Sequence, residues 1–339
     1  MLEKKLGKQT VQLRNPPAIV STASIVGPKE GKGPLAGYFD QAVEDVLWGE
    51  KTWEKAESKF MREALARTAA KASIAISGID YVIAGDLLNQ CIAASFGIRE
   101  SGIPFFGIYG ACSTMGESMS IGAMLIDGGF AAQVVCLTSS HFCSAEKQFR
   151  FPLELGTQRA PTAQWTVTGA GGVLLAAEGT GPFVTRITTG KIVDMGIKDQ
   201  NNMGAAMAPA AADTIYSHFE DTGLPHDYYD MVVTGDLGSV GKEILDDLLS
   251  SNGVNISGIL NDCGLMIYGN DQDVHAGGSG CGCCATVFAG FLYESMKKGK
   301  LEKILFVPTG ALLSPTSVQQ GETIPCIAHA VAVENVIGR

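Results

Sequence analysis

The chain lacks the segments that place a protein in a membrane or send it out of the cell. No apolar run reaches the roughly 18–20 residues that a membrane-spanning helix needs. Residues 1–17 carry Lys4, Lys5 and Lys8, but no apolar core follows them as it would in a secretory signal. We therefore expect a cytoplasmic protein that reaches a membrane surface only through partner proteins.

A basic surface and a zinc motif are lacking too. The formal net charge is −10, and nucleic-acid binding needs a basic face, so we expect no nucleic-acid partner. Of the nine cysteines, Cys281, Cys283 and Cys284 resemble half of a metal site, but no second pair has zinc-finger spacing. We expect free thiols that pack as small residues on a buried helix, and we assign no metal and no cofactor.

A long internal repeat is the most informative feature that is present. Residues 79–88 and 229–238 lie 150 positions apart and share Asp, Val, Gly, Asp and Leu in the same places. Two further similarities follow in the same order, between 110–114 and 280–284 and between 168–175 and 326–333. A period this long is too large for a solenoid and predicts a duplicated α/β unit. No linker separates the copies, so we expect two halves, 1–185 and 186–339, around one core.

The sequence also predicts individual elements. Buried strands are expected at 80–85, 104–109 and 230–235, and helices at 34–72 and 86–101. Residues 141–165 read as an irregular polar loop, and long loops in compact domains are often functional.

Cys112 occupies a position that suits chemistry. It lies in a Gly-Ala-Cys turn between the predicted strand 104–109 and a small-residue helical pattern. A helix N-terminus lowers the pKa of a thiol, and its N–H groups equally suit an anion. Cysteine is also a common buried residue, so a packing role stays open.

A duplicated βα unit with a cysteine on this turn resembles the thiolase fold of condensing enzymes. The resemblance implies an α/β fold of five layers, made of two similar βα halves, in a homodimer. Thiolases pair the cysteine with a histidine in a Gly-His-Pro turn, whereas this chain has Gly277-Gly278-Ser279 there. Asp236 stands where a base-containing dyad is expected, and the motif at Cys326 lacks its glycines. We therefore expect no Claisen condensation, although an acyltransferase or degenerate condensing enzyme with Cys112 as acyl acceptor stays an alternative.

Six phrases in order resemble the stage V sporulation protein AD family. They lie at 84–90, 110–114, 148–150, 207–214, 277–281 and 309–316. The resemblance implies a non-enzymatic protein that binds dipicolinic acid (pyridine-2,6-dicarboxylate), free or as its calcium chelate, for uptake into the developing spore and release in germination. It also implies a peripheral place at the spore inner membrane, beside the membrane proteins of the same dipicolinate channel.

The residues suggest how a planar dianion would be held. Arg150 can bond one carboxylate as a fork, and the N–H groups around Cys112, Ser113 and Thr114 can receive the other. The remaining expected ligand-facing residues are Asp86, Asn89, His141 and His329. Structural alternatives stay open for most of them: a helix cap for Asp86 and its repeat mate Asp236, a loop ion pair for Arg150 with Glu146 or Glu154, and burial for the histidines.

Overall fold

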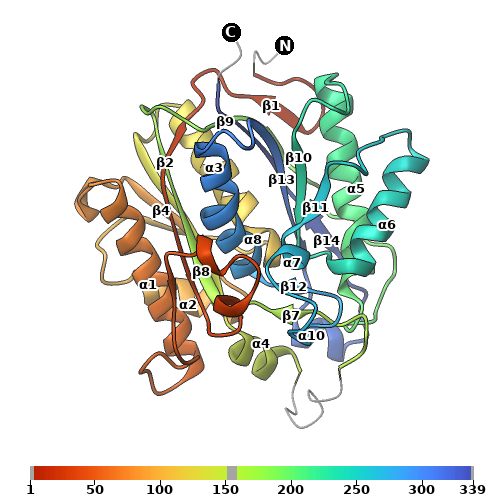
Figure 1. Ribbon diagram of the computed structural model, residues 1–339, viewed down its shortest axis with the longest axis horizontal. Coiled ribbons are helices and arrows are strands. Elements are labelled where there is room, and N and C mark those ends of the chain that lie inside the picture. The colour runs from red at the N-terminus through yellow and green to blue at the C-terminus, as the bar shows by residue number, and fades with distance from the viewer. Residues whose placement is uncertain (1–3, 151–158, 337–339) are drawn as a thin grey trace.

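Two five-stranded units with the same internal order form the framework of the protein (Figure 1). The computed structural model describes residues 4–150 and 159–336. The first unit has the order β5-β4-β6-β8-β2 and the second has β11-β10-β13-β15-β9. In each unit the first three strands run parallel and the last two pair antiparallel, and the units meet where β2 pairs β9 at Ala18 and Phe183. The matching order confirms the predicted duplication.

The strands of the first unit are β2 (Ala18–Val26), β4 (Tyr81–Gly85), β5 (Phe105–Gly107), β6 (Gln133–Ser140) and β8 (Gly169–Ala176). Those of the second are β9 (Phe183–Thr188), β10 (Met231–Gly235), β11 (Leu260–Asp262), β13 (Lys303–Ala311) and β15 (Ala330–Glu334). Short strands complete the set: β1 (Thr10–Gln12), β3 (Gln41–Ala42), β7 (Trp165–Thr166), β12 (Gly278–Ser279) and β14 (Cys326–Ala328). The expected boundary at 185/186 falls inside β9, so the second unit begins at Phe183 by this topology.

Helices make three layers around the two sheets (Figure 1). The central layer contains α3 (Thr114–Asp127) and the run α8 (Cys281–Val287), a π-helix (Phe288–Leu292) and α9 (Tyr293–Lys297). The outer layers contain α1 (Trp53–Lys71) and α2 (Ile92–Ile98) on the first unit, and α5 (Met203–Thr222) and α6 (Gly238–Ser251) on the second. Shorter helices are α4 (Phe142–Phe149), α7 (Cys263–Met266) and α10 (Pro315–Gln319). The five alternating layers confirm the expected thiolase-like α/β fold.

Small residues let the central helices fit between two sheets. A Cβ on Gly116 of α3 would lie 3.1 Å from the carbonyl oxygen of His329, in the second half. A Cβ on Gly122 would lie 3.0 Å from the Cys136 sulfur of β6, in the first half. The apolar, small-residue composition that the sequence shows at 114–127 therefore follows from close packing on both sides.

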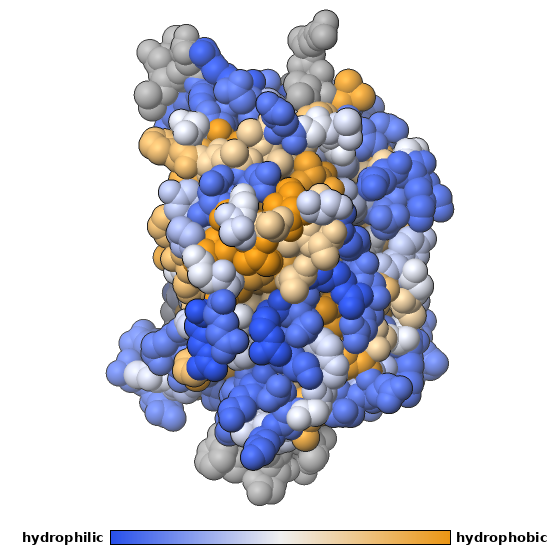
Figure 2. Space-filling model, turned by 90° about the vertical axis from the view of Figure 1, so that its left-hand side faces the viewer, coloured by the Kyte–Doolittle hydropathy of each residue, from blue (hydrophilic) through white to orange (hydrophobic). Residues whose placement is uncertain are grey.

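Strand β5 is the free edge of the first unit, since β4 is its one pairing partner among the described strands. All three of its residues are exposed, including Phe105 and Phe106, and α2 adds exposed Phe96. Figure 2 shows apolar surface gathered on the side of the molecule where α1 and α2 lie. An open strand edge with apolar side chains is a surface suited to pairing with another chain.

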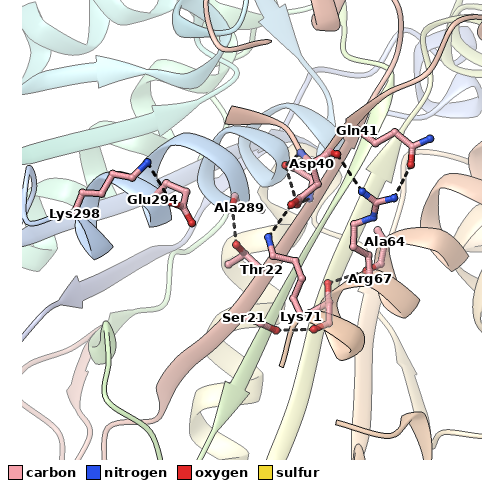
Figure 3. A network of polar contacts seen from close by, with 12 residues as sticks. Ser21, Thr22, Asp40, Gln41, Ala64, Arg67, Lys71, Ala289, Glu294 and Lys298 are labelled. Atoms are coloured by element: carbon pink, nitrogen blue, oxygen red, sulfur yellow. Dashed lines mark hydrogen bonds and ion pairs between the residues drawn. The ribbon is translucent and has the colours of Figure 1, made fainter. Parts of the chain in front are cut away.

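Strand β2 is bonded to helices on both of its faces (Figure 3). The Ser21 hydroxyl donates to the Thr68 carbonyl of outer helix α1 at 2.7 Å. The next hydroxyl, on Thr22, donates to the Ala289 carbonyl of the central π-helix, also at 2.7 Å. Successive side chains of a strand point to opposite faces, so these two bonds demonstrate that the sheet is covered on both sides.

Three sequence-based predictions of elements were wrong at their ends. The helix expected over 34–72 begins at Trp53, where Thr52 caps it by accepting from the Lys55 N–H. The helix expected over 86–101 is limited to α2, because Gln90 and Cys91 have positive φ angles that interrupt it. Residues 142–149 of the expected polar loop form α4, and 151–158 lie outside the described residues.

All nine cysteines are free thiols, as expected. Within residues 4–150 and 159–336, no helix combines the length and apolar character needed to cross a membrane. The same residues hold no group of three or more His, Cys, Asp or Glu side chains arranged for a metal ion.

Candidate functional site

Cys112 lies on a tight elbow that leads into the central helix α3. A short 3-10 helix (Ala111–Ser113) precedes α3, and Ala111 has a φ of +50°. A non-glycine residue in this left-handed region is uncommon and marks a conformation held by its surroundings. The predicted place of Cys112 at a helix N-terminus is confirmed.

The second half of the chain supports this elbow. A Cβ on Gly310 of β13 would lie 2.1 Å from the Gly110 carbonyl oxygen and 3.1 Å from the Cys112 nitrogen. The Cys281 thiol donates to the Ala111 carbonyl at 2.9 Å, and the Cys284 thiol donates to the Cys112 carbonyl at 3.5 Å. The cysteines of α8 therefore pack against the elbow as small residues.

A cleft between the two halves opens beside Cys112. It contains roughly 660 Å³ of empty space, a volume that includes open solvent at its mouth. Its walls are mostly apolar, and its charged members are Glu146 and Arg150 at the end of α4. Both halves contribute lining residues: Leu87, Tyr109, Ala111, Cys112, Ala145, Glu146, Phe149, Arg150, Thr166, Gln200, Met203, Met207, Ser279, Gly280, Ala311 and Leu313.

The Cys112 thiol is protonated, contrary to the sequence-based expectation of a thiolate. Burial raises its pKa well above the usual value, and the nearby carboxyl of Asp236 raises it further. The N–H groups of Gly280 and Cys112 oppose this rise only in part. The thiol is 8% exposed, so desolvation outweighs the helix N-terminus.

The N–H groups after Cys112 are already in use. The Ser113 N–H donates to the Gly110 carbonyl at 3.1 Å, and the Thr114 N–H donates to the Ala111 carbonyl. The hydroxyls of Ser113 and Thr114 also donate to these two carbonyls, at 2.7 and 2.6 Å. Both side chains are fully buried and neither lines the cleft, so their expected ligand-binding role is replaced by one in holding the elbow.

Asp86 is buried and acts as a cap. Its carboxylate oxygens accept from the N–H groups of Leu88 and Ala94, each at 2.8 Å, which fixes the turn that leads into α2. Burial is the first cause that raises its pKa to about 6. Asp86 is absent from the cleft lining, so it is not placed to supply an oxygen to a ligand there.

His141 also has its ring satisfied by the protein. Its Nδ1 accepts from the Cys143 N–H at 3.2 Å, so its Nε2–H donates to the Val46 carbonyl at 2.7 Å. This residue is the N-cap of α4, and burial lowers its pKa. Its position matches the structural alternative rather than the ligand-facing one.

The remaining expected residues divide between the cleft and its neighbourhood. Arg150 lines the cleft and forms an ion pair with Glu146, with 3.5 Å between Nε and Oε1. The ion pair matches the structural alternative expected for Arg150, and its place in the cleft lining keeps it available to a ligand. Asn89 lines an adjoining pocket, and its backbone N–H donates to the Gln148 side chain at 2.9 Å. His329 is buried away from the cleft lining, where its Nδ1 accepts from the Gly190 N–H at 3.3 Å and burial lowers its pKa to about 4.

Asp236 is a buried acid near the Cys112 thiol, and its burial and raised pKa were not predicted from the sequence. It is fully buried with a φ of +78°, and the Cys283 thiol and the Gly280 N–H are the donors near its carboxyl. Burial and the neighbouring Asp262 raise its pKa well above the usual value. A buried carboxyl is a different group from the histidine that pairs with the cysteine of a thiolase, and the sequence indicated this only by placing aspartate where a dyad was expected.

Sequence comparison connects the chain to one family. A family model described as "Stage V sporulation protein AD (SpoVAD)" matches residues 7–334. The stage V sporulation protein AD of Bacillus subtilis (strain 168) is 44% identical over 335 residues, which cover 99% of each chain.

Structural comparison gives a more distant likeness. The 3-oxoacyl-[acyl-carrier-protein] synthase III of Aquifex aeolicus has 15% identity and a TM-score of 0.55, covering 94% of this chain and 99% of that one. The cerulenin-bound OleA of Xanthomonas campestris has 15% identity and a TM-score of 0.62, covering 95% and 98%. At such low identity the likeness establishes the fold of condensing enzymes and leaves the chemistry open.

Proposed function

The chain belongs to the stage V sporulation protein AD family and is a sporulation protein, and on that premise we propose that the cleft beside Cys112 binds dipicolinate. The ligand is free pyridine-2,6-dicarboxylate or its calcium chelate. Its binding serves uptake into the developing spore and release in germination. The observation that carries the proposal is the cleft itself, which has mostly apolar walls and Arg150 among its lining residues.

The walls suit a planar aromatic dianion. Leu87, Phe149 and Met203 offer apolar surface for the two faces of a pyridine ring. Arg150 has a planar fork that matches one carboxylate in two parallel bonds, which a lysine cannot provide. Glu146 is the one carboxylate among the lining residues, so it is the candidate oxygen donor to calcium when the chelate is bound.

We propose further that the cleft does no acyl chemistry. Burial raises the pKa of the Cys112 thiol well above its usual value, and no histidine is among the residues that line the cleft to take its proton. Protein that transfers acyl groups would instead carry a thioester on Cys112, which mass spectrometry after incubation with acyl thioesters would detect.

Association with the spore inner membrane is proposed to be peripheral and to depend on membrane proteins of the same dipicolinate channel. The acidic chain is repelled by an anionic leaflet, so a partner must supply the attraction. We also propose a homodimer through the open edge of β5, where Phe105 and Phe106 are exposed. An edge strand can continue its sheet into a second copy and bury these rings.

Isothermal titration calorimetry with calcium-free dipicolinate tests the ligand. We expect Arg150→Ala to weaken binding roughly ten- to a hundredfold, the cost of a lost charged hydrogen bond of about 1.5–3 kcal/mol. Arg99→Ala is the matched control, because Arg99 lies on the surface beside Glu100. Cys112→Ala should retain binding, and benzoate, with one carboxylate, should bind more weakly. Normal binding by Arg150→Ala would place the ligand elsewhere, and no binding by the unaltered protein would end the proposal.

A further inference from the structure

Glu57 is an acid of the outer helix α1 that the protein encloses completely. Its side chain is 1% exposed, and its carboxyl contacts two serine hydroxyls rather than a cation. Oε2 lies 2.6 Å from Ser144 Oγ of α4, and Oε1 lies 3.2 Å from Ser139 Oγ of β6. A buried acid is costly unless it is neutral or fully bonded, so the state of this carboxyl affects how α4 packs on α1.

The hydrogen bonds assign a proton to Glu57. The Ser144 hydroxyl has one proton to donate, and it lies 3.0 Å from the His141 carbonyl oxygen as well as 2.6 Å from Glu57 Oε2. A proton on Oε2 satisfies both contacts, because Glu57 then donates to Ser144 and Ser144 donates to His141. Asp86, in contrast, accepts N–H groups with both oxygens and is the partner that is ionised. Burial and then Asp86 raise the pKa of Glu57 to about 8, in agreement with this assignment.

The groups around Glu57 offer nothing to offset a negative charge on it. Glu54 of α1 and Asp86 both oppose ionisation. The elements packed against this part of α1 are α2, α4, β2, β6 and β8, and of these α2, β2 and β8 contain no titratable side chain. The titratable groups of β6 and of α4 with its N-cap are Cys136, His141, Cys143, Glu146 and Lys147. Lys147 is the cation among them, and it pairs with Glu54 at 2.6 Å.

Helix α4 connects Glu57 to the cleft. Ser144 lies in the first turn of this helix, and four cleft-lining residues follow it on the helix and its C-cap: Ala145, Glu146, Phe149 and Arg150. Two like charges in a buried site repel each other, and the weaker attachment yields first. That attachment is α4, because it is a helix of eight residues on the outside of the sheet, whereas β6 is bonded between β4 and β8.

We propose that Glu57 is a positioning residue for the cleft, whose protonated carboxyl bonds Ser144 and holds α4 where Arg150 can meet the dicarboxylate. The inference rests on the proposed function and adds control of ligand affinity by protons. Affinity is complete while Glu57 is neutral. It falls as Glu57 ionises beside Asp86 and loosens α4, and the bound ligand in turn favours the protonated form.

Two serine variants test the link to α4. Ser144→Ala and Ser139→Ala each remove one hydroxyl from the same carboxyl, but only Ser144 belongs to the helix that lines the cleft. Calorimetry with calcium-free dipicolinate at pH 7 should show roughly two- to tenfold weaker binding by Ser144→Ala, the effect of one neutral hydrogen bond. Ser139→Ala should bind as the unaltered protein does. Equal affinities of the two variants would overturn the proposal.

The proton is tested by the ratio of affinities at pH 7 and pH 9. With its pKa near 8, Glu57 is mostly neutral at the first pH and mostly ionised at the second, so the unaltered protein should lose roughly three- to tenfold in affinity. Glu57→Gln keeps a neutral group that donates to Ser144 and accepts from Ser139, so it should bind normally at pH 7 and lose less at pH 9. Ionisation of Glu146 is common to both proteins, so the difference between them reports Glu57. Glu63→Gln, on the same helix with a 42% exposed side chain, should follow the unaltered protein.

The outcomes separate this inference from the function on which it rests. Equal pH ratios for the unaltered protein and Glu57→Gln, with dipicolinate still bound, refute the role of Glu57 and leave the proposed function standing. Glu57→Ala should bind weakly at pH 7, and if Glu57→Gln binds no better, the neutral hydrogen bond is not what positions the cleft. Absence of dipicolinate binding by the unaltered protein overturns both the inference and the function.

Discussion

Replacing Glu146 by glutamine tests how the cleft handles charge. Glu146 lines the cleft beside Arg150, with 3.5 Å between its Oε1 and Arg150 Nε. In the empty cleft its carboxylate competes with a ligand carboxylate for the same donors. The amide of Glu146→Gln keeps the shape and removes the competing charge, so we expect free dipicolinate to bind more tightly.

The magnitude follows from the geometry of the pair. Two unit charges 3.5 Å apart attract by about 5 kcal/mol at an effective dielectric constant of 20. Most of that is offset by desolvation, because the Arg150 and Glu146 side chains are 20% and 9% exposed, and partly exposed pairs have a net worth of about 0.5–1 kcal/mol. Releasing Arg150 from this pair should therefore tighten binding about two- to fivefold.

The pH dependence gives a second signature. Burial raises the pKa of Glu146, so the group is protonated over a wider range than an exposed glutamate and ionises as the pH rises through that pKa. The affinity of the unaltered protein should decline as Glu146 ionises, and this decline should be absent from Glu146→Gln. With calcium present the effect should change sign, because the amide oxygen of the variant is a neutral and weaker donor to the ion than the carboxylate.

Calorimetry between about pH 5 and pH 8, with chelator and then with calcium, measures the change in affinity, its dependence on pH and its change of sign with calcium. Glu54→Gln is the matched control. Glu54 of α1 forms a 2.6 Å ion pair with Lys147 of α4, the helix that also contains Glu146, and Glu54 does not line the cleft. If Glu146→Gln binds free dipicolinate no better than the unaltered protein and follows the same pH course, the ligand does not meet the Arg150–Glu146 pair.

Three further predictions concern stability, the thiol and assembly. Burial and Asp86 raise the pKa of Glu57 to about 8, so its contribution to stability is complete at low pH and is lost as pH rises through 8. Thermal melts should show Tm falling between about pH 4.5 and pH 8, less so in Glu57→Gln, while Glu63→Gln, whose side chain is 42% exposed, should follow the unaltered protein. Parallel curves for Glu57→Gln and the unaltered protein would contradict the assignment. Iodoacetamide should label Cys112 slowly at neutral pH because the thiol is buried and protonated, and rapid labelling with bound acyl groups would instead support an acyltransferase. Phe106→Lys on the open β5 edge should convert a dimer to a monomer in analytical ultracentrifugation, and an unchanged mass would exclude that edge.

Much of the fold could be predicted from the sequence because duplication leaves a local record. The Gly-Asp phrases at Asp86 and Asp236 sit at the ends of matching strands, β4 and β10, and the strand order repeats around them. The turn at Cys112 was predictable for the same reason, since Gly-Ala-Cys before a small-residue helix is a local pattern. The ends of α1 and α2 were less predictable, because capping at Thr52 and positive φ angles at Gln90 and Cys91 override helical spacing.

The candidate site was predicted only in part. Arg150 and Cys112 line the cleft, and both were identified from their neighbours in sequence. Asp86 and His141 were expected to face a ligand, but backbone groups of their own turns and of Val46 satisfy them. Ser113 and Thr114 were also expected to face a ligand, but their N–H and hydroxyl groups bond the carbonyls of Gly110 and Ala111.

The sequence by itself determined the duplicated architecture, the family and the place of Cys112 at the start of a central helix. Only the tertiary structure decided the protonation state of that thiol. Cys112 belongs to the first half and Asp236 to the second, and folding buries both and brings the carboxyl close enough to raise the pKa of the thiol. A pKa responds to burial and to charges brought close in space, and neither quantity can be read from residues that lie far apart along the chain.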